Sequence, residues 1–194
     1  MTKIIIISGS MRQGRSTPLV AKWVAQTAEL VIEDKAEIAI VDLADFDLPM
    51  FDEAISPKFN RERKPEGAVK KWLDTLAAAD GYIFVTPEYN HSIPGSLKNA
   101  IDYIAFETNK KAATIVSHGG VGGARATEHL RNIASEIGLV TTPVVANLIG
   151  YPGMQPVINE EGTLVDTTSE AQAKLETGLE QLLWYTEALK TARS

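Results

Sequence analysis

The stretch that decides the fold runs from Lys3 to Leu19. It reads Lys3-Ile4-Ile5-Ile6-Ile7-Ser8-Gly9-Ser10-Met11-Arg12-Gln13-Gly14-Arg15-Ser16-Thr17-Pro18-Leu19. Four successive isoleucines are typical of a strand buried on both faces, because stiff β-branched side chains suit such a position. The polar segment that follows leads to Pro18, a residue suited to the first turn of a helix. The stretch therefore predicts a buried strand, a polar loop and a helix N-terminus in succession.

This succession is an arrangement that binds phosphate groups. The backbone N–H groups of the loop, its hydroxyls and the positive end of the helix dipole converge on one place. Arg12 or Arg15 could add a charge-assisted hydrogen bond to a phosphate oxygen. The alternative is an ordinary turn between strand and helix, whose serines only cap the helix.

The composition limits the classes of protein to be considered. A chain of 194 residues, 44% hydrophobic and 23% charged, is expected to form one soluble domain. The net charge of −6 argues against an extended surface for nucleic acid or anionic membranes. The absence of cysteine excludes disulfides, thiolate catalysis and cysteine-based metal sites, and no metal is expected. With no signal peptide and no apolar run of about 20 residues, a cytoplasmic location without membrane contact is expected.

Alternating strand and helix patterns continue along the chain. Apolar residues at helical spacing predict helices over about residues 17–33, 69–79, 97–104, 124–137 and 169–192, with Trp23, Trp72 and Trp184 on their apolar faces. Short apolar runs predict further strands at Glu37–Asp42, Gly81–Thr86, Ala113–Ser117 and Val144–Leu148. Five strands alternating with five helices indicate an α/β fold with a doubly wound, five-stranded parallel sheet covered by helices on both faces.

Three distinctive loops fall at the same edge of this predicted sheet. Residues 9–16, 87–96 and 117–123 each follow a predicted strand. Ligands of open parallel sheets bind at the carboxyl ends of the strands, next to the switch in strand order. The three loops are therefore expected to form one ligand site.

Several phosphate ligands compete for that site. The glycines do not fit the dinucleotide pattern G-x-G-x-x-G. A nucleotide-hydrolysing P-loop is a closer rival, because Gly9, Gly14 and Ser16 have its spacing and Asp42 ends a strand as a magnesium-binding residue would. However, Arg15 stands where the P-loop needs a lysine, and arginine does not replace that lysine conservatively.

The other two loops favour a flavin. Pro87-Glu88-Tyr89-Asn90 offers backbone groups and a flat aromatic ring to a planar ligand, and Pro94 keeps Ile93 extended. Ser117-His118-Gly119-Gly120 allows the backbone to come close on another side, because glycine has no Cβ. A monophosphate in the first loop and a flat heterocycle between the other two describe FMN.

With these motifs the chain resembles the NAD(P)H-dependent FMN reductase family of flavodoxin-like proteins. The resemblance covers about residues 3–148. It is carried by Gly9-Ser10-Met11-Arg12-Gln13-Gly14-Arg15-Ser16-Thr17, by the motif from Pro87-Glu88-Tyr89-Asn90-His91-Ser92 to Asp102, and by Ser117 to Leu130 with Gly122-Gly123-Ala124-Arg125. It implies the flavodoxin-like strand order 2-1-3-4-5 and FMN as cofactor, with NADPH or NADH as cosubstrate.

The resemblance also implies which residues hold the cofactor. Ser10, Arg12, Ser16 and Thr17 would bind the phosphate, Pro87, Glu88, Tyr89 and Asn90 would line the isoalloxazine, and Ser117, His118 and Gly119 would border its pyrimidine side. Thr17 stands where many relatives have asparagine, which keeps a polar donor but shortens its reach. No side chain need be catalytic, since the cofactor carries the chemistry. Arg15 is expected at the rim, near the approach of the pyridine nucleotide.

The implied reaction moves a hydride from NAD(P)H to FMN and then two electrons to a quinone-type or other small acceptor. The alternative is a flavodoxin-type electron carrier, or a flavin-binding regulator, without turnover. The resemblance suggests a homodimer or homotetramer, and the irregular segment 43–65 is either a subunit contact or a solvated loop. Glu88 is interpreted as a residue that shapes its loop rather than a general base, and His118 as one that contributes backbone geometry.

Overall fold

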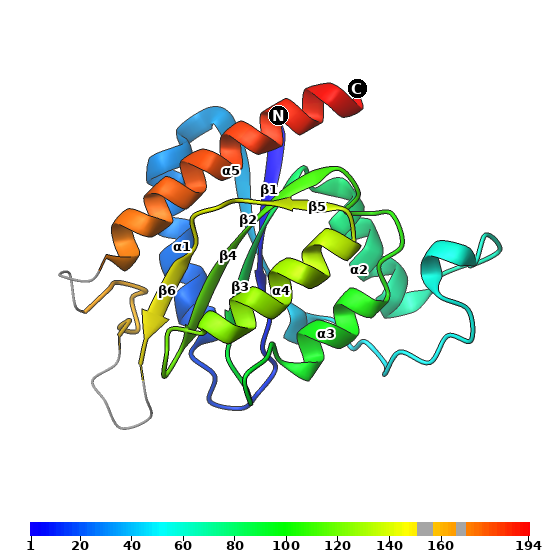
Figure 1. The fold of residues 1–194 in the computed structure, drawn as a ribbon, viewed down its shortest axis with the longest axis horizontal. Coiled ribbons are helices and arrows are strands. Elements are labelled where there is room, and N and C mark those ends of the chain that lie inside the picture. The colour runs from blue at the N-terminus through cyan, green and yellow to red at the C-terminus, as the bar shows by residue number, and fades with distance from the viewer. Residues whose placement is uncertain (151–156, 166–169) are drawn as a thin grey trace.

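The computed structural model describes residues 1–150, 157–165 and 170–194 (Figure 1). Its strands are β1 (Thr2–Ser8), β2 (Ala36–Asp42), β3 (Gly81–Pro87), β4 (Lys111–Gly119), β5 (Leu139–Thr141) and β6 (Ala146–Ile149). Its helices are α1 (Thr17–Ile32), α2 (Gly67–Ala78), α3 (Gly95–Asp102), α4 (Ala124–Glu136) and α5 (Ala171–Arg193). Three short 3₁₀ helices, η1 (Glu33–Lys35), η2 (Leu43–Asp45) and η3 (Pro57–Phe59), lie in the connections.

The strands form one parallel sheet in the order β2-β1-β3-β4-β5, which confirms the predicted flavodoxin-like topology. The register places Ser8 beside Asp42 and Val85, and Thr86 beside Ser117. The carboxyl ends of β1, β3 and β4 therefore lie together at one edge, and the loops that leave them meet there (Figure 1).

The prediction of one continuous fifth strand at Val144–Leu148 is wrong in its bounds. Two short strands occupy that position: β5 pairs with the first three residues of β4, and β6 pairs with its last four. Between them lies Pro143, which has no N–H to donate to the ladder. Arg131 of α4 donates to the backbone carbonyls of Thr142 and Pro143, so these two carbonyls between the strands are hydrogen-bonded by a side chain.

The alternation of β1 divides the core into two layers. Ile5 and Ile7 pack with α2, α3 and α4 on one face of the sheet, and Ile4 and Ile6 pack with α1 and α5 on the other. Figure 1 shows the two helical layers on either side of the sheet. All four isoleucines are at most 1% exposed, as expected for a central strand. Burying four such side chains contributes roughly 1.5–3 kcal/mol each.

Helix α5 was predicted to begin near Ser169 and to bury Trp184 on its apolar face. Helix α5 begins at Ala171, and Ser169, the predicted start, lies outside the described residues. The prediction that Trp184 packs on an apolar helix face is wrong, because its side chain is 66% exposed. The buried side of α5 carries Leu179 and Leu182, and Trp184 turns away from them, against Tyr185 at a ring-centroid distance of 5.1 Å. Trp23 and Trp72 are buried as predicted.

The ends of the chain lie at the edge of the sheet opposite the three loops (Figure 1). Near the end of α5, the Lys190 amine donates to the Met1 carbonyl and to Asp80. Asp80 also accepts from the backbone N–H of Lys3 and from Arg193. Among the helices that the structure describes, none has the length and apolar character needed to cross a membrane.

Candidate functional site

The loop after β1 presents hydroxyls and a guanidinium beside the N-terminus of α1. Residues 9–17 contain Ser10, Ser16, Thr17 and two arginines, and no carboxylate. The Ser16 side chain makes no capping bond to α1, so its hydroxyl stays available to a ligand. Gly14, at a φ of 65°, makes the turn, a conformation that glycine adopts without strain. This set of donors suits an anion with several oxygens.

Tyr89 connects this loop with the loop after β3. Its hydroxyl lies 2.8 Å from the Ser10 hydroxyl, and Ser10 is fully buried. The Arg12 guanidinium lies over the Tyr89 ring, 5.3 Å from the centroid, within the range of a cation–π contact. Two of the predicted phosphate ligands are therefore in direct contact with a predicted flavin neighbour.

His118, near the end of β4, connects that strand with the start of α1. Its Nε2 atom lies 3.1 Å from Oγ1 of Thr17, whose side chain is fully buried. Burial, together with the positive charge of Arg12, lowers the pKa of His118 to about 4. The imidazole is therefore neutral near neutral pH. Its backbone carbonyl accepts from the N–H of Glu88, which joins the second and third loops at 3.0 Å.

Asn90 and His91 form a tight turn that the sequence did not reveal. Their φ values are 49° and 67°, and Tyr89 and Ser92 exchange both backbone hydrogen bonds around them. A two-residue turn with both central residues at positive φ is the type I′ hairpin turn, in which asparagine is common. The turn leaves Asn90 exposed, and within the described residues its side chain makes no hydrogen bond to the loop 9–17. The Asn-His pair at the centre of the turn is only a weak sequence signal for a type I′ turn.

The Glu88 carboxylate is bound to the N-terminus of α4, in agreement with its interpretation as a loop-shaping residue. One carboxylate oxygen accepts from Arg125 Nε at 2.6 Å, and the other accepts from the backbone N–H groups of Arg125 and Ala126. Burial opposes ionisation of Glu88, but these hydrogen bonds and the Arg125 charge outweigh it and lower its pKa. The carboxylate thus acts as an anion at a helix N-terminus. Sequence reasoning had assigned Arg125 no role, although it lies in the third motif.

The Ser117 hydroxyl is likewise hydrogen-bonded to other groups of the protein. Its fully buried hydroxyl donates to the Gly122 carbonyl and accepts from Thr127 and from the Asn147 amide, all within 2.9 Å. These bonds fix the end of β4, where His118 and Gly119 lie, and the turn that follows it. Gly119 has a φ of 150°, and a Cβ there would lie 3.5 Å from the Glu88 side chain. Any contact of Ser117 with a ligand has to come through its backbone.

Arg15 pairs with Asp42 at the end of β2. Its NH2 atom lies 2.8 Å from one carboxylate oxygen, and each side chain is 21% exposed. The other oxygen accepts from the Ala44 N–H, so both carboxylate oxygens of Asp42 are bound. Arg15 N also donates to the Arg12 carbonyl, which closes the turn of the phosphate loop. The structure thus ties Arg15 to the edge strand.

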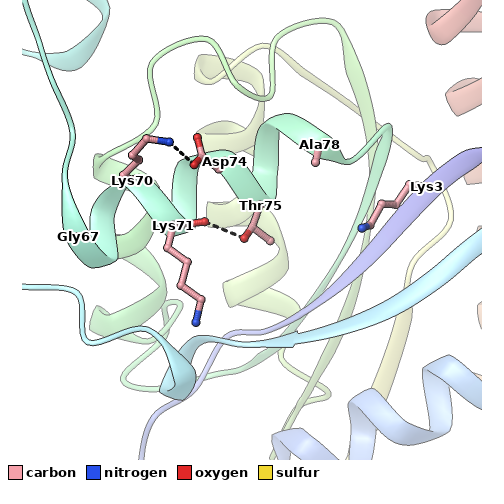
Figure 2. A pocket seen from close by; sticks show the side chains of 7 residues that line it. All are labelled: Lys3, Gly67, Lys70, Lys71, Asp74, Thr75 and Ala78. Atoms are coloured by element: carbon pink, nitrogen blue, oxygen red, sulfur yellow. Dashed lines mark hydrogen bonds and ion pairs between the residues drawn. The ribbon is translucent and has the colours of Figure 1, made fainter.

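Hollows lie at two places among the described residues. One, of about 480 Å³, adjoins the turn after Tyr89 and is lined by Asn90, His91, Ala124, Arg125, Glu128 and His129. The other, of about 520 Å³, is lined by Lys3, Gly67, Lys70, Lys71, Asp74, Thr75 and Ala78 (Figure 2). It lies along α2 near the amino end of β1, remote from the three loops. Lys70 pairs there with Asp74, and Lys71 lies 4.8 Å from the Phe46 ring centroid.

The residues present fit FMN. The first loop supplies hydroxyl and guanidinium donors without an opposing carboxylate, as a phosphate requires. Tyr89 and His118 join that loop to the two others, and Gly119 allows close approach of a flat ligand. In the described residues, no group of three or more His, Cys, Asp or Glu side chains could hold a metal ion.

Comparison with known proteins gives a consistent result. Residues 2–151 match the family described as NADPH-dependent FMN reductase. An NAD(P)H-dependent FMN reductase of Schizosaccharomyces pombe is 36% identical over 146 residues, covering 75% of this chain and 72% of that protein. A quinone reductase of Escherichia coli is 32% identical over 137 residues, 68% of each.

Solved structures share the fold. The flavoenzyme FerB of Paracoccus denitrificans, an NAD(P)H:(acceptor) oxidoreductase, superposes with a TM-score of 0.69, at 22% identity and over 97% of this chain and 98% of that one. The RosB structure superposes with a TM-score of 0.75, at 15% identity, over 98% of this chain and 81% of that one. The family match favours an enzyme over the carrier or regulator. The chain belongs to the NADPH-dependent FMN reductase family and is an NAD(P)H-dependent oxidoreductase that uses FMN.

Proposed function

We propose that this enzyme reduces quinone-type small molecules with NADPH or NADH. When bound, FMN would accept a hydride from the nicotinamide and, with one proton from solvent, deliver two electrons to the quinone, which leaves as the hydroquinone. The observation that carries the proposal is the convergence of three loops, through the Ser10–Tyr89 and Thr17–His118 contacts of 2.8 and 3.1 Å. The Escherichia coli relative, named a quinone reductase, supports the choice of acceptor.

The proposal assigns the ligand contacts as follows. The phosphate is bound by Ser10, Arg12, Ser16 and Thr17; the isoalloxazine lies against Pro87, Glu88, Tyr89 and Asn90; and its pyrimidine side is bordered by Ser117, His118 and Gly119. Glu88 and Ser117 act through their backbone, because their side chains are bound to α4 and to the loop 118–123. Arg12 is the cation for the phosphate, since Arg15 is paired with Asp42. No side chain is assigned as catalytic.

An absorbance spectrum of the purified protein tests the cofactor. The protein should be yellow, with flavin near one equivalent per chain, and anaerobic NADPH or NADH should bleach it. Steady oxidation of either nucleotide in the presence of a quinone tests turnover. A colourless protein that cannot take up FMN would refute the flavin site, and bleaching without turnover on any quinone would refute the proposed acceptor class.

The proposal includes a homodimer or homotetramer and a single cytoplasmic domain. The segment 48–64 supports a subunit contact, because Met50, Ile55 and Phe59 are 78%, 53% and 80% exposed. The segment is also anchored to α3, since the Asn99 side chain accepts from the Phe51 N–H and donates to the Pro49 carbonyl. Within the segment, Arg63 makes a bidentate pair with Glu53. Exposed apolar side chains on an ordered segment favour association. Sedimentation of the wild-type protein tests this, and a monomer at micromolar concentration would contradict it.

A further inference from the structure

The hydrogen bond between His118 and Thr17 has a direction that matters for the proposed phosphate site. His118 Nε2 and Thr17 Oγ1 are 3.1 Å apart, and they join the end of β4 to the first residue of α1. Thr17 is fully buried, and its hydroxyl lies at the helix N-terminus where the phosphate is proposed to bind. The inference below rests on that proposed function.

A threonine hydroxyl carries one proton and can donate it once. If Nε2 of the imidazole is unprotonated, it accepts that proton, and Thr17 then presents only lone pairs to an anion. If Nε2 carries hydrogen, it donates to Oγ1, and the hydroxyl proton of Thr17 is free for a phosphate oxygen. The two arrangements have the same heavy-atom distance but opposite effects on an anion.

Because His118 is neutral, its tautomer decides whether Nε2 accepts from Thr17 or donates to it. Arg12 lies close enough that its charge disfavours the imidazolium form, and burial acts in the same direction. A neutral imidazole has one N–H, on either Nδ1 or Nε2. The Glu88 N–H holds the His118 backbone through its carbonyl, so the ring is attached to a fixed segment.

We propose that His118 is a positioning residue for the FMN phosphate: its Nε2–H donates to Thr17 Oγ1, and this directs the Thr17 hydroxyl proton to the phosphate. His118 thereby increases the preference for FMN over riboflavin, which has the same ring system but no phosphate. This role adds to its proposed contact with the pyrimidine side of the ring. It acts through Thr17 and involves no proton transfer in the reaction.

Matched variants test the proposal by flavin affinity. Dissociation constants of FMN and riboflavin are measured with the apoprotein by quenching of flavin fluorescence, for wild type, His118→Met, His118→Gln, Thr17→Val and Thr17→Ser. We expect His118→Met and Thr17→Val each to weaken FMN binding about tenfold more than riboflavin binding, the effect of one hydrogen bond to a charged group. His118→Gln keeps an N–H donor of similar reach, and Thr17→Ser keeps the hydroxyl, so both should retain the preference for FMN.

The pair should also behave as one unit. The double variant His118→Met/Thr17→Val should lose no more FMN affinity than either single variant, because both remove the same directed proton. In the wild-type complex with FMN, ¹⁵N NMR of the imidazole should show hydrogen on Nε2. This measurement needs no substitution and remains decisive where a variant fails to fold.

Several outcomes would overturn the proposal. Equal weakening of FMN and riboflavin in His118→Met would mean that His118 acts on the ring or the fold. Unchanged FMN affinity in that variant, or hydrogen on Nδ1 in the FMN complex, would exclude the directed bond. Wild-type protein that binds both flavins equally would overturn the phosphate role but leave the flavin site standing. Wild-type protein that binds neither would refute the proposed function itself.

Discussion

The pH dependence of stability provides a direct test of the His118 environment. Burial and Arg12 lower its pKa from the usual 6.5 of a histidine to about 4 in the folded protein. Between these values the unfolded chain binds a proton that the folded chain does not, so the free energy of unfolding falls as the pH falls. Each unit of difference corresponds to about 1.4 kcal/mol, so the complete loss is about 3 kcal/mol and the loss at about pH 5 is roughly 2 kcal/mol.

Urea unfolding of the apoprotein at about pH 7.5 and about pH 5 measures this difference, with His118→Gln as the matched control. Glutamine has no titrating group, so the variant should lose roughly 2 kcal/mol less than wild type over this interval. Asp80 and Glu88, whose pKa values are lowered, lose their stabilisation at lower pH and affect both proteins alike. Parallel losses in the two proteins would show that His118 is not held neutral and would refute the reasoning.

Three further substitutions test contacts around the site. Asp42→Asn removes the counter-charge of Arg15 and loosens the phosphate loop, so fluorescence titration should show FMN binding weakened about three- to tenfold. Gly123→Ala should lower the free energy of unfolding by about 2–3 kcal/mol in urea, because φ is 74° and a Cβ would lie 2.7 Å from that of Ser117. Asn99→Ala removes two hydrogen bonds to the loop after β2 and should cost about 1–3 kcal/mol by the same assay.

For each of the three substitutions, one result would contradict the prediction. Unchanged FMN affinity in Asp42→Asn would mean that the ion pair does not order the loop, and riboflavin serves as the ligand without a phosphate. Wild-type stability in Gly123→Ala would show that the Ser117 loop can move aside. For Asn99→Ala, a loss no larger than that of Lys98→Ala would contradict the anchoring role. Among the described residues, the amine of the neighbouring Lys98 bonds only to Asp102 of its own helix.

The central strands were predictable because their signal is local. Four isoleucines in β1 and the run Gly81–Thr86 in β3 suit burial on both faces, whatever else surrounds them. The fifth strand was not predictable in its bounds, because Leu139–Thr141 is too short to stand out. Its interruption depends on partners elsewhere, namely Arg131 and the pairing of β4 with both pieces.

The candidate site was also predictable only in part. Topology alone predicts that the three loops meet, since the carboxyl ends of parallel strands share an edge. The direction of individual side chains depends on tertiary contacts that no spacing encodes. Glu88, for example, turns to the N-terminus of α4. Trp184 is different, because it lies two positions from the buried Leu182 and Thr186 and therefore on the opposite face of α5. Helical spacing was sufficient to predict that Trp184 points outward.

The ion pair between Arg15 and Asp42 explains why a P-loop spacing does not make a P-loop here. In a nucleotide-hydrolysing enzyme, the cation at position 15 reaches the terminal phosphates and the acidic residue after the second strand holds magnesium. In this protein the two side chains bind one another at 2.8 Å, which occupies both groups. Of the two arginines in the loop, only Arg12 keeps a charge without a carboxylate partner in the described part of the chain. One such cation, three hydroxyls and a helix N-terminus suit a single monophosphate, as FMN carries, better than a triphosphate with its metal.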